Sequence, residues 1–217
     1  MEKRPVLEAV FILDASGSMH SLTEDTIGGF NALLAEQKQK AEGGRVLVTT
    51  VTFNANSRTI HDRIDVNSVP ELTEADYRAY GSTALLDAMG DTIRHIETIH
   101  KYARPEDLPQ KTLFMITTDG LENASRKYGS DEIKKMVKEK QKEDGWEFIF
   151  VAANIDAVET GARYGIDEKY VAPYLNDSRG NRKKFAAMSY AMDSFMTSGK
   201  VCEDWAAELK ADVDKRS

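Results

Sequence analysis

Short apolar segments with strand character alternate with amphipathic helical segments along this 217-residue chain. Strands are predicted at residues 5–13, 45–53, 58–66, 111–118, 146–153 and 168–172, and helices at 21–42, 83–102, 131–144, 157–164, 180–196 and 203–214. This alternation predicts an α/β fold of the doubly wound, Rossmann-like kind, with a mostly parallel six-stranded sheet and helices on both faces. The predicted hairpin, residues 45–66, adds one antiparallel edge strand.

The length of the chain predicts one domain with one core. We expect residues 1–196 to form this domain, and residues 197–217 to form a C-terminal helical extension packed on it. The apolar run at residues 6–13 is interrupted by Glu8 and is too short for a signal-peptide core or a membrane span. A single cysteine, Cys202, excludes an internal disulfide and fits a reducing compartment, so we expect a cytoplasmic location.

Charge and metal-ligand spacing exclude two classes of function. The 36 acidic and 29 basic residues give a net charge of −7, which repels phosphate backbones, so no nucleic-acid partner is expected. One cysteine and four histidines without the spacing of a zinc-binding helix make a zinc site unexpected. Asp87, Asp91 and His95 recur along one helical face, where the alternatives are a second metal site and a solvated surface; the pattern favours the solvated surface.

Polar residues gather where the predicted elements meet the carboxyl edge of the sheet. Residues 14–18, Asp-Ala-Ser-Gly-Ser, follow the first strand, Asp119 follows the strand at 111–118, and a helix opens at Thr83. Ligands bind at this edge in open parallel sheets. Carboxylates and hydroxyls are hard oxygen donors, which favour Mg²⁺ or Mn²⁺ over Zn²⁺, whereas Ca²⁺ would need extra waters. Taken singly, each segment also fits a helix cap or a turn.

Taken together, these segments resemble the von Willebrand factor type A (vWA) domain of the bacterial cytoplasmic type, with its metal-ion-dependent adhesion site (MIDAS). The family pattern is Asp-x-Ser-x-Ser, a later Thr, and a later Asp before Gly, and it is matched by Asp14, Ser16, Ser18, Thr83 and Asp119. The resemblance covers roughly residues 5–195. It implies that these side chains hold Mg²⁺ or Mn²⁺, with Ca²⁺ less expected, directly or through water.

The resemblance also implies a non-enzymatic, metal-dependent module that binds a Glu or Asp of a protein partner at an open position of the metal. It leaves the partner unidentified, and relatives work beside ATPases or in assembly and stress-response systems. His20, Glu122 and Asn123 follow the metal loops and are candidates for the partner-facing rim. No residue is predicted to be catalytic.

The alternative function is a Mg²⁺-dependent hydrolase or phosphatase. An Asp after a first strand also occurs in haloacid-dehalogenase-type phosphatases, but those carry an acid two residues later, where this chain has Ser16.

Among the remaining features, the basic run at residues 179–184 favours a solvated helix start over a phosphate site. For Asn154, a turn is favoured over a position at the ligand-binding edge of the sheet. For Gly28 and Gly29, a role in helix packing is favoured over a role in a ligand-driven movement of the helix.

Overall fold

The computed structural model describes residues 5–40 and 44–216. Its sheet contains β1 (Pro5–Asp14), β2 (Arg45–Phe53), β3 (Ser57–Asp65), β4 (Lys111–Thr118), β5 (Glu147–Ala152) and β6 (Val171–Pro173), in the order β3-β2-β1-β4-β5-β6. Every neighbouring pair is parallel except β2 and β3. The predicted α/β architecture with one antiparallel edge strand is therefore confirmed.

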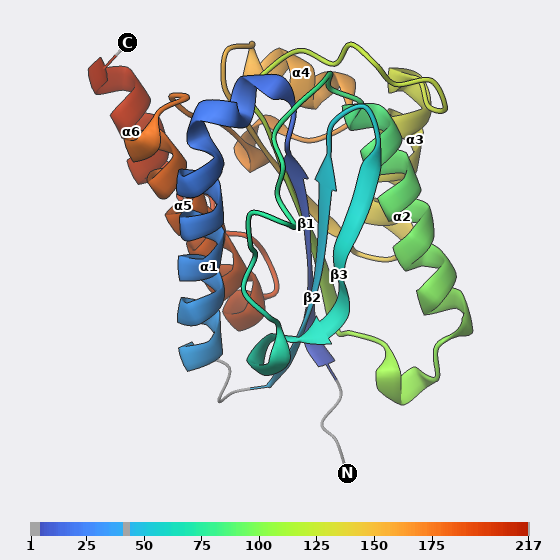
Figure 1. Cartoon of the computed structure of the whole chain (residues 1–217). Coiled ribbons are helices and arrows are strands. Elements are labelled where there is room, and N and C mark those ends of the chain that lie inside the picture. Colours follow the sequence, from blue (N-terminus) through green and yellow to red (C-terminus); the bar gives the residue numbers. More distant parts are fainter. Residues whose placement is uncertain (1–4, 41–43, 217) are drawn as a thin grey trace.

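Helices of the described chain cover both faces of this sheet (Figure 1). On one side lie α1 (Thr23–Lys40), α5 (Ser178–Ser198) and α6 (Ala207–Arg216), and on the other lie α2 (Leu85–Tyr102) and α3 (Ser130–Glu143). The short α4 (Ala157–Arg163) connects β5 to β6. In the part of the chain that the structure describes, four 3₁₀ turns complete the elements: η1 (Gly17–Leu22), η3 (Val66–Ser68), η4 (Pro105–Asp107) and η5 (Glu168–Tyr170). Within the described residues, none of the helices has the length and apolarity needed to cross a membrane.

Most boundaries differ from the predictions by one or two residues, and the helix predicted at 83–102 begins at Leu85. In three places a turn or a 3₁₀ segment explains the difference. The helix predicted at 21–42 begins at Thr23, because the preceding residues form η1, and residues 41–42 lie outside the described part of the chain. The strand predicted at 168–172 divides into η5 and the three-residue β6. The last helix begins at Ala207 rather than at residue 203, since a turn in which the Trp205 amide donates to the Cys202 carbonyl at 3.2 Å comes first.

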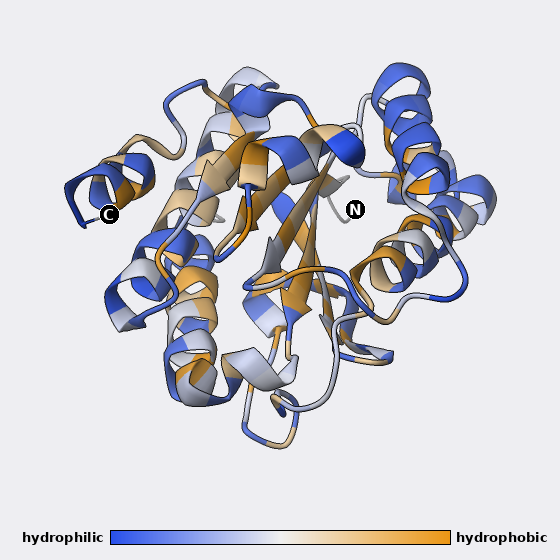
Figure 2. Cartoon of the chain, turned by 90° about the horizontal axis from the view of Figure 1, so that it is seen from above, coloured by the Kyte–Doolittle hydropathy of each residue, from blue (hydrophilic) through white to orange (hydrophobic). Residues whose placement is uncertain are grey.

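The core lies between the sheet and its helices, and Figure 2 shows hydrophobic strands enclosed by helices with hydrophilic outer surfaces. Side chains of β1 are buried on both faces, as a central parallel strand requires. Phe30 of α1 meets Phe11 edge-on, with ring centroids 5.1 Å apart, and lies 6.3 Å from Phe185 of α5. A Cβ at Gly29 would come within 2.4 Å of Phe185, so this glycine serves packing, whereas Gly28 faces open space.

Glu8 interrupts the apolar run of β1 because it forms a buried charge cluster. Its carboxylate is fully buried and lies 2.8 Å from Arg63 Nε and 2.6 Å from His100 Nε2. Arg63 belongs to β3 and has a left-handed backbone, with φ of 51°, where the pairing of β2 and β3 is irregular. The charge of Glu8 is thus paired by residues from an edge strand and a helix.

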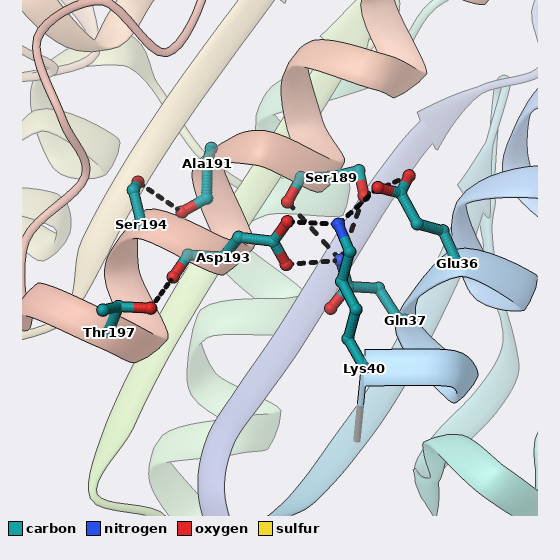
Figure 3. Close-up of polar contacts among 8 residues, drawn as sticks. All are labelled: Glu36, Gln37, Lys40, Ser189, Ala191, Asp193, Ser194 and Thr197. Carbon is teal, nitrogen blue, oxygen red and sulfur yellow. Dashed lines mark hydrogen bonds and ion pairs between the residues drawn. The ribbon is translucent and has the colours of Figure 1, made fainter. Parts of the chain in front are cut away.

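The contact between α1 and α5 is partly polar (Figure 3). Gln37, only 1% exposed, donates through Nε2 to Ser189 Oγ and to Asp193 Oδ1, both at 3.0 Å. Ser189 Oγ donates to Glu36 Oε2 at 2.7 Å, and Lys40 pairs with both Glu36 and Asp193. Because buried polar groups need partners, these contacts define one register between the two helices.

The C-terminal segment packs on the domain through Trp205. This side chain is 2% exposed, and its Nε1 donates to the Lys169 carbonyl at 2.9 Å. Leu209 of α6 is also buried, and Arg216 pairs with Asp177 at the start of α5. Residues after α5 therefore contribute to the same core.

We expect Trp205→Ala to lower the free energy of unfolding by about 3–5 kcal/mol, because a large core side chain and the partner of a carbonyl are lost together. Chemical denaturation measures this change. Tyr102→Ala is the matched control: that ring is 75% exposed, so its loss is expected to cost less than about 0.5 kcal/mol. Unchanged stability of Trp205→Ala would contradict a structural role for the segment.

Candidate metal centre

Asp14 ends β1 with its carboxylate buried, 2% exposed, and held by several donors. Oδ1 accepts the Ser16 amide at 2.7 Å, and Oδ2 accepts Thr118 Oγ1 at 2.7 Å and the Asp119 amide at 3.4 Å. The Tyr77 hydroxyl donates to the Asp14 backbone carbonyl. Burial raises the pKa of Asp14; the hydrogen bonds from Ser16 and Thr118 oppose this rise, and the nearby Asp119 adds to it.

The two serines connect this carboxylate to that of Asp119, which directly follows β4. Ser16 Oγ lies 3.1 Å from Ser18 Oγ, and Ser18 Oγ donates to Asp119 Oδ1 at 2.6 Å. Asn176, in the loop after β6, donates to the other oxygen of Asp119 at 2.9 Å. The structure thus brings four of the five predicted metal ligands into one hydrogen-bonded cluster of oxygen atoms.

Thr83, the fifth predicted ligand, is brought to the same edge by its loop. The Gly17 amide donates to the Gly81 carbonyl at 3.0 Å, and the Tyr80 amide donates to the Ala15 carbonyl at 2.9 Å. Gly81 has a left-handed backbone, with φ of 76°, which suits glycine. Thr83 is buried and does not cap α2, whose N-cap is Ala84 without a side-chain capping bond.

Two of the predicted rim residues bind within the domain. Asn123 Oδ1 accepts the Thr83 amide at 2.9 Å, and the Asn123 amide donates to the Thr83 carbonyl at 3.1 Å. The Glu122 carboxylate accepts the amides of Leu86 at 3.0 Å and Ser125 at 2.7 Å. Both residues therefore position the loop beside Thr83, while His20 is exposed on η1. A partner-facing role for the three stays a prediction.

Several residues of this edge were outside the sequence predictions. Thr118 is adjacent to Asp119 in the chain, and its place at the strand end is a usable signal. Asn176 follows β6, so the rule that sites form at carboxyl ends of parallel strands would have included it. Tyr77 lies in an irregular loop that carries no periodic signal. Asn154, for which a turn was favoured, reaches the crevice: its side chain donates to the Asp119 carbonyl at 2.9 Å.

Lys184 differs from the solvated helix start predicted for residues 179–184. Its side chain is 1% exposed, with Nζ 4.6 Å from the centroid of the Tyr174 ring. Burial lowers the pKa of Lys184 to about 7, whereas Asp14 and Asp119 act in the opposite direction. Only part of the run is solvated as predicted. Arg179, for example, lies at the surface and pairs with Asp212 at 2.7 Å.

Asp87 holds the loop after Asp119 through backbone hydrogen bonds. Its carboxylate accepts the amides of Arg126 at 2.9 Å, Lys127 at 2.8 Å and Tyr128 at 3.1 Å, and Asp91 pairs with Lys127. Across residues 5–40 and 44–216, no three His, Cys, Asp or Glu side chains form a group that could hold a metal. The candidate centre at Asp14 therefore depends on its hydroxyl groups as well as its carboxylates.

We expect Asp87→Asn to lower the free energy of unfolding by about 1–3 kcal/mol at pH 7. Burial opposes the charge of Asp87, but its three backbone donors outweigh burial and lower the pKa. The charge therefore stabilises the fold above about pH 4, and this stabilisation disappears as the pH falls further. Denaturation at pH 7 and pH 3 tests this, with exposed Glu106→Gln as the control. A difference as large at pH 3 as at pH 7 would contradict it.

Comparisons with known proteins identify the fold. Neither a protein-family model nor a curated protein matches the sequence. A mutant of the PilB minor pilin from Streptococcus sanguinis is similar, with a TM-score of 0.62, 12% identity, and coverage of 92% of this chain and 64% of that one. The vWF domain of the type V pili tip protein Mfa5 from Porphyromonas gingivalis has a TM-score of 0.60, 8% identity, and coverage of 94% and 100%.

A von Willebrand factor type A protein from Catenulispora acidiphila is also similar, with a TM-score of 0.56 and 12% identity, over 87% of this chain and 42% of that one. The chain thus spans less than two thirds of the pilin and less than half of the Catenulispora protein. At sequence identities this low, the similarity supports a shared fold and nothing more. The strand order, the helices on both faces and these structural relatives agree: the chain has the von Willebrand factor type A fold.

Proposed function

We propose that this chain is a divalent-metal-dependent protein-interaction module that binds a carboxylate of a protein partner. The residues proposed to hold the metal are Asp14, Ser16, Ser18, Thr83 and Asp119. The observation that carries the proposal is the cluster of oxygen atoms at the ends of two strands. In this cluster Ser18 Oγ lies 2.6 Å from Asp119 Oδ1 and 3.1 Å from Ser16 Oγ. Hydrogen bonds among the side chains hold this cluster together.

The chemistry of these groups fits Mg²⁺ or Mn²⁺. All donors are hard oxygens, and two carboxylates balance the charge of a divalent ion; Ca²⁺ usually takes more oxygens than this set offers. Burial raises the pKa of Asp14, so its charged form lacks compensation that a cation would supply. When bound, the metal would offer an electrophilic position to an external carboxylate.

The surrounding residues orient these ligands. Thr118 and Asn176 each donate to one of the two carboxylates, and Asn123 holds the backbone of Thr83. Such partners of metal ligands fix their orientation. Ser18 is exposed, so a partner is proposed to approach from its side.

We propose no catalytic role. Ser16 stands where a dehalogenase-type phosphatase has its second acid, and a serine hydroxyl does not serve as the carboxylic acid that such a mechanism needs. The partner is proposed to be a protein that presents Glu or Asp, such as an ATPase or a component of an assembly or stress-response system. A cytoplasmic location stays a prediction from the single Cys202. Pilus proteins are among the similar structures, and fractionation of cells tests the location.

We expect metal-free protein to bind Mg²⁺ or Mn²⁺ at one saturable site in a calorimetric titration. Asp14→Ala and Thr83→Ala are expected to weaken binding by more than about 100-fold, since even residues that only support a ligand account for about 10–100-fold. Asp91→Ala, at a side chain paired with Lys127, is the control and should bind normally. Circular dichroism verifies folding. Metal binding that survives in Asp14→Ala would refute the site.

A further inference from the structure

Two large apolar side chains are exposed beside the candidate metal centre. In the described residues, the exposed large hydrophobic residues are Tyr80, Tyr102, Leu121, Val158 and Tyr190. Tyr80, 62% exposed, precedes Thr83 by three residues, and Leu121, 68% exposed, follows Asp119 by two. Single apolar side chains on a surface need no explanation. These two are notable because they lie on separate loops that both reach the candidate metal centre.

Backbone hydrogen bonds attach both loops to the centre. The Tyr80 amide donates to the Ala15 carbonyl at 2.9 Å, within the Asp14–Ser18 segment. The Asn123 amide donates to the Thr83 carbonyl at 3.1 Å, which ties the loop of Leu121 to the loop of Tyr80. The two side chains therefore start from defined positions at the carboxyl edge of the sheet, and a contact with them costs little ordering of the backbone.

A pocket of about 130 Å³ lies next to Tyr80. Its lining includes Ala15, Phe53, Asn54, Arg58, Arg78 and Tyr80. Ala15 separates Asp14 from Ser16, so this pocket adjoins the metal loop directly. Arg58 pairs with Asp76 at 3.7 Å, and Arg78 is exposed. Asp76 also lines the pocket, so two arginines and one aspartate leave a net positive charge there. This charge favours an acidic segment, although the chain as a whole carries a net charge of −7.

We propose that Tyr80 and Leu121 form an apolar contact surface for the partner, and that the partner segment carries a large aliphatic residue beside its metal-binding Glu or Asp. This inference deepens the proposed function and rests on it. Its support is the attachment of both loops to the metal centre and the net positive charge of the pocket lining next to Tyr80. An acidic residue flanked by leucine or isoleucine satisfies both features.

Two five-residue peptides test the inference on the full, Mg²⁺-saturated chain. Both have blocked ends and a central Glu between outer glycines, and the residues flanking the Glu are leucines in one and serines in the other. We expect the leucine peptide to bind at least about tenfold more tightly in an NMR titration, since burying one such side chain accounts for that factor. Tyr80→Ser and Leu121→Ser should each reduce this preference, while Mg²⁺ binding and binding of the serine peptide stay unchanged.

The control is Tyr102→Ser, which removes an exposed ring at the far end of α2 and should retain the preference. Tyr80→Phe should retain it as well, and thermal unfolding verifies that each variant folds. Equal affinity for the two peptides would overturn the inference and leave the proposed function intact. Self-association of the chain that Tyr80→Ser abolishes would make a second copy the occupant and also overturn it. Binding of neither peptide despite bound Mg²⁺ would refute the proposed function together with this inference.

Discussion

Asp14 and Asp119 place two carboxylates at the ends of adjacent strands, where both are almost inaccessible to water. Like charges in such a place are costly, and the domain surrounds them with donors: Thr118 for the first carboxylate, Asn176 for the second. The buried ammonium of Lys184 also interacts electrostatically with both. The loops at this edge are arranged around these two groups, because each must supply a hydrogen bond or tie another loop in place.

The periodic secondary structure could be predicted from the sequence, whereas contacts between residues far apart in the chain could not. Periodicity shows the strands and main helices, and parallel topology places Asp14 and Asp119 at one edge. The burial of Lys184 depends on how α5 packs, which a run of basic residues does not reveal. Glu8 likewise looks like an interruption of a strand, because its partners Arg63 and His100 come from β3 and α2.

In the loops after β4 and before α2, polar side chains bind backbone groups of the domain itself. Glu122 and Asn123 look like recognition residues in sequence, since they are polar and follow a predicted ligand. Their side-chain oxygens also accept backbone amides at the start of α2 and at Thr83. The buried backbone N–H and C=O groups of a loop at a strand end need hydrogen-bond partners.

The two sheet edges determine how other chains can associate with this one. β3 departs from regular pairing near Arg63, with its left-handed backbone, and β6 is three residues long and ends in Pro173. A foreign strand extends a sheet where an edge is long and regular, and proline offers no N–H for such pairing. Intermolecular β-pairing is therefore disfavoured at both edges. The fold is thereby protected against edge-to-edge aggregation, even if many copies are held close together in an assembly.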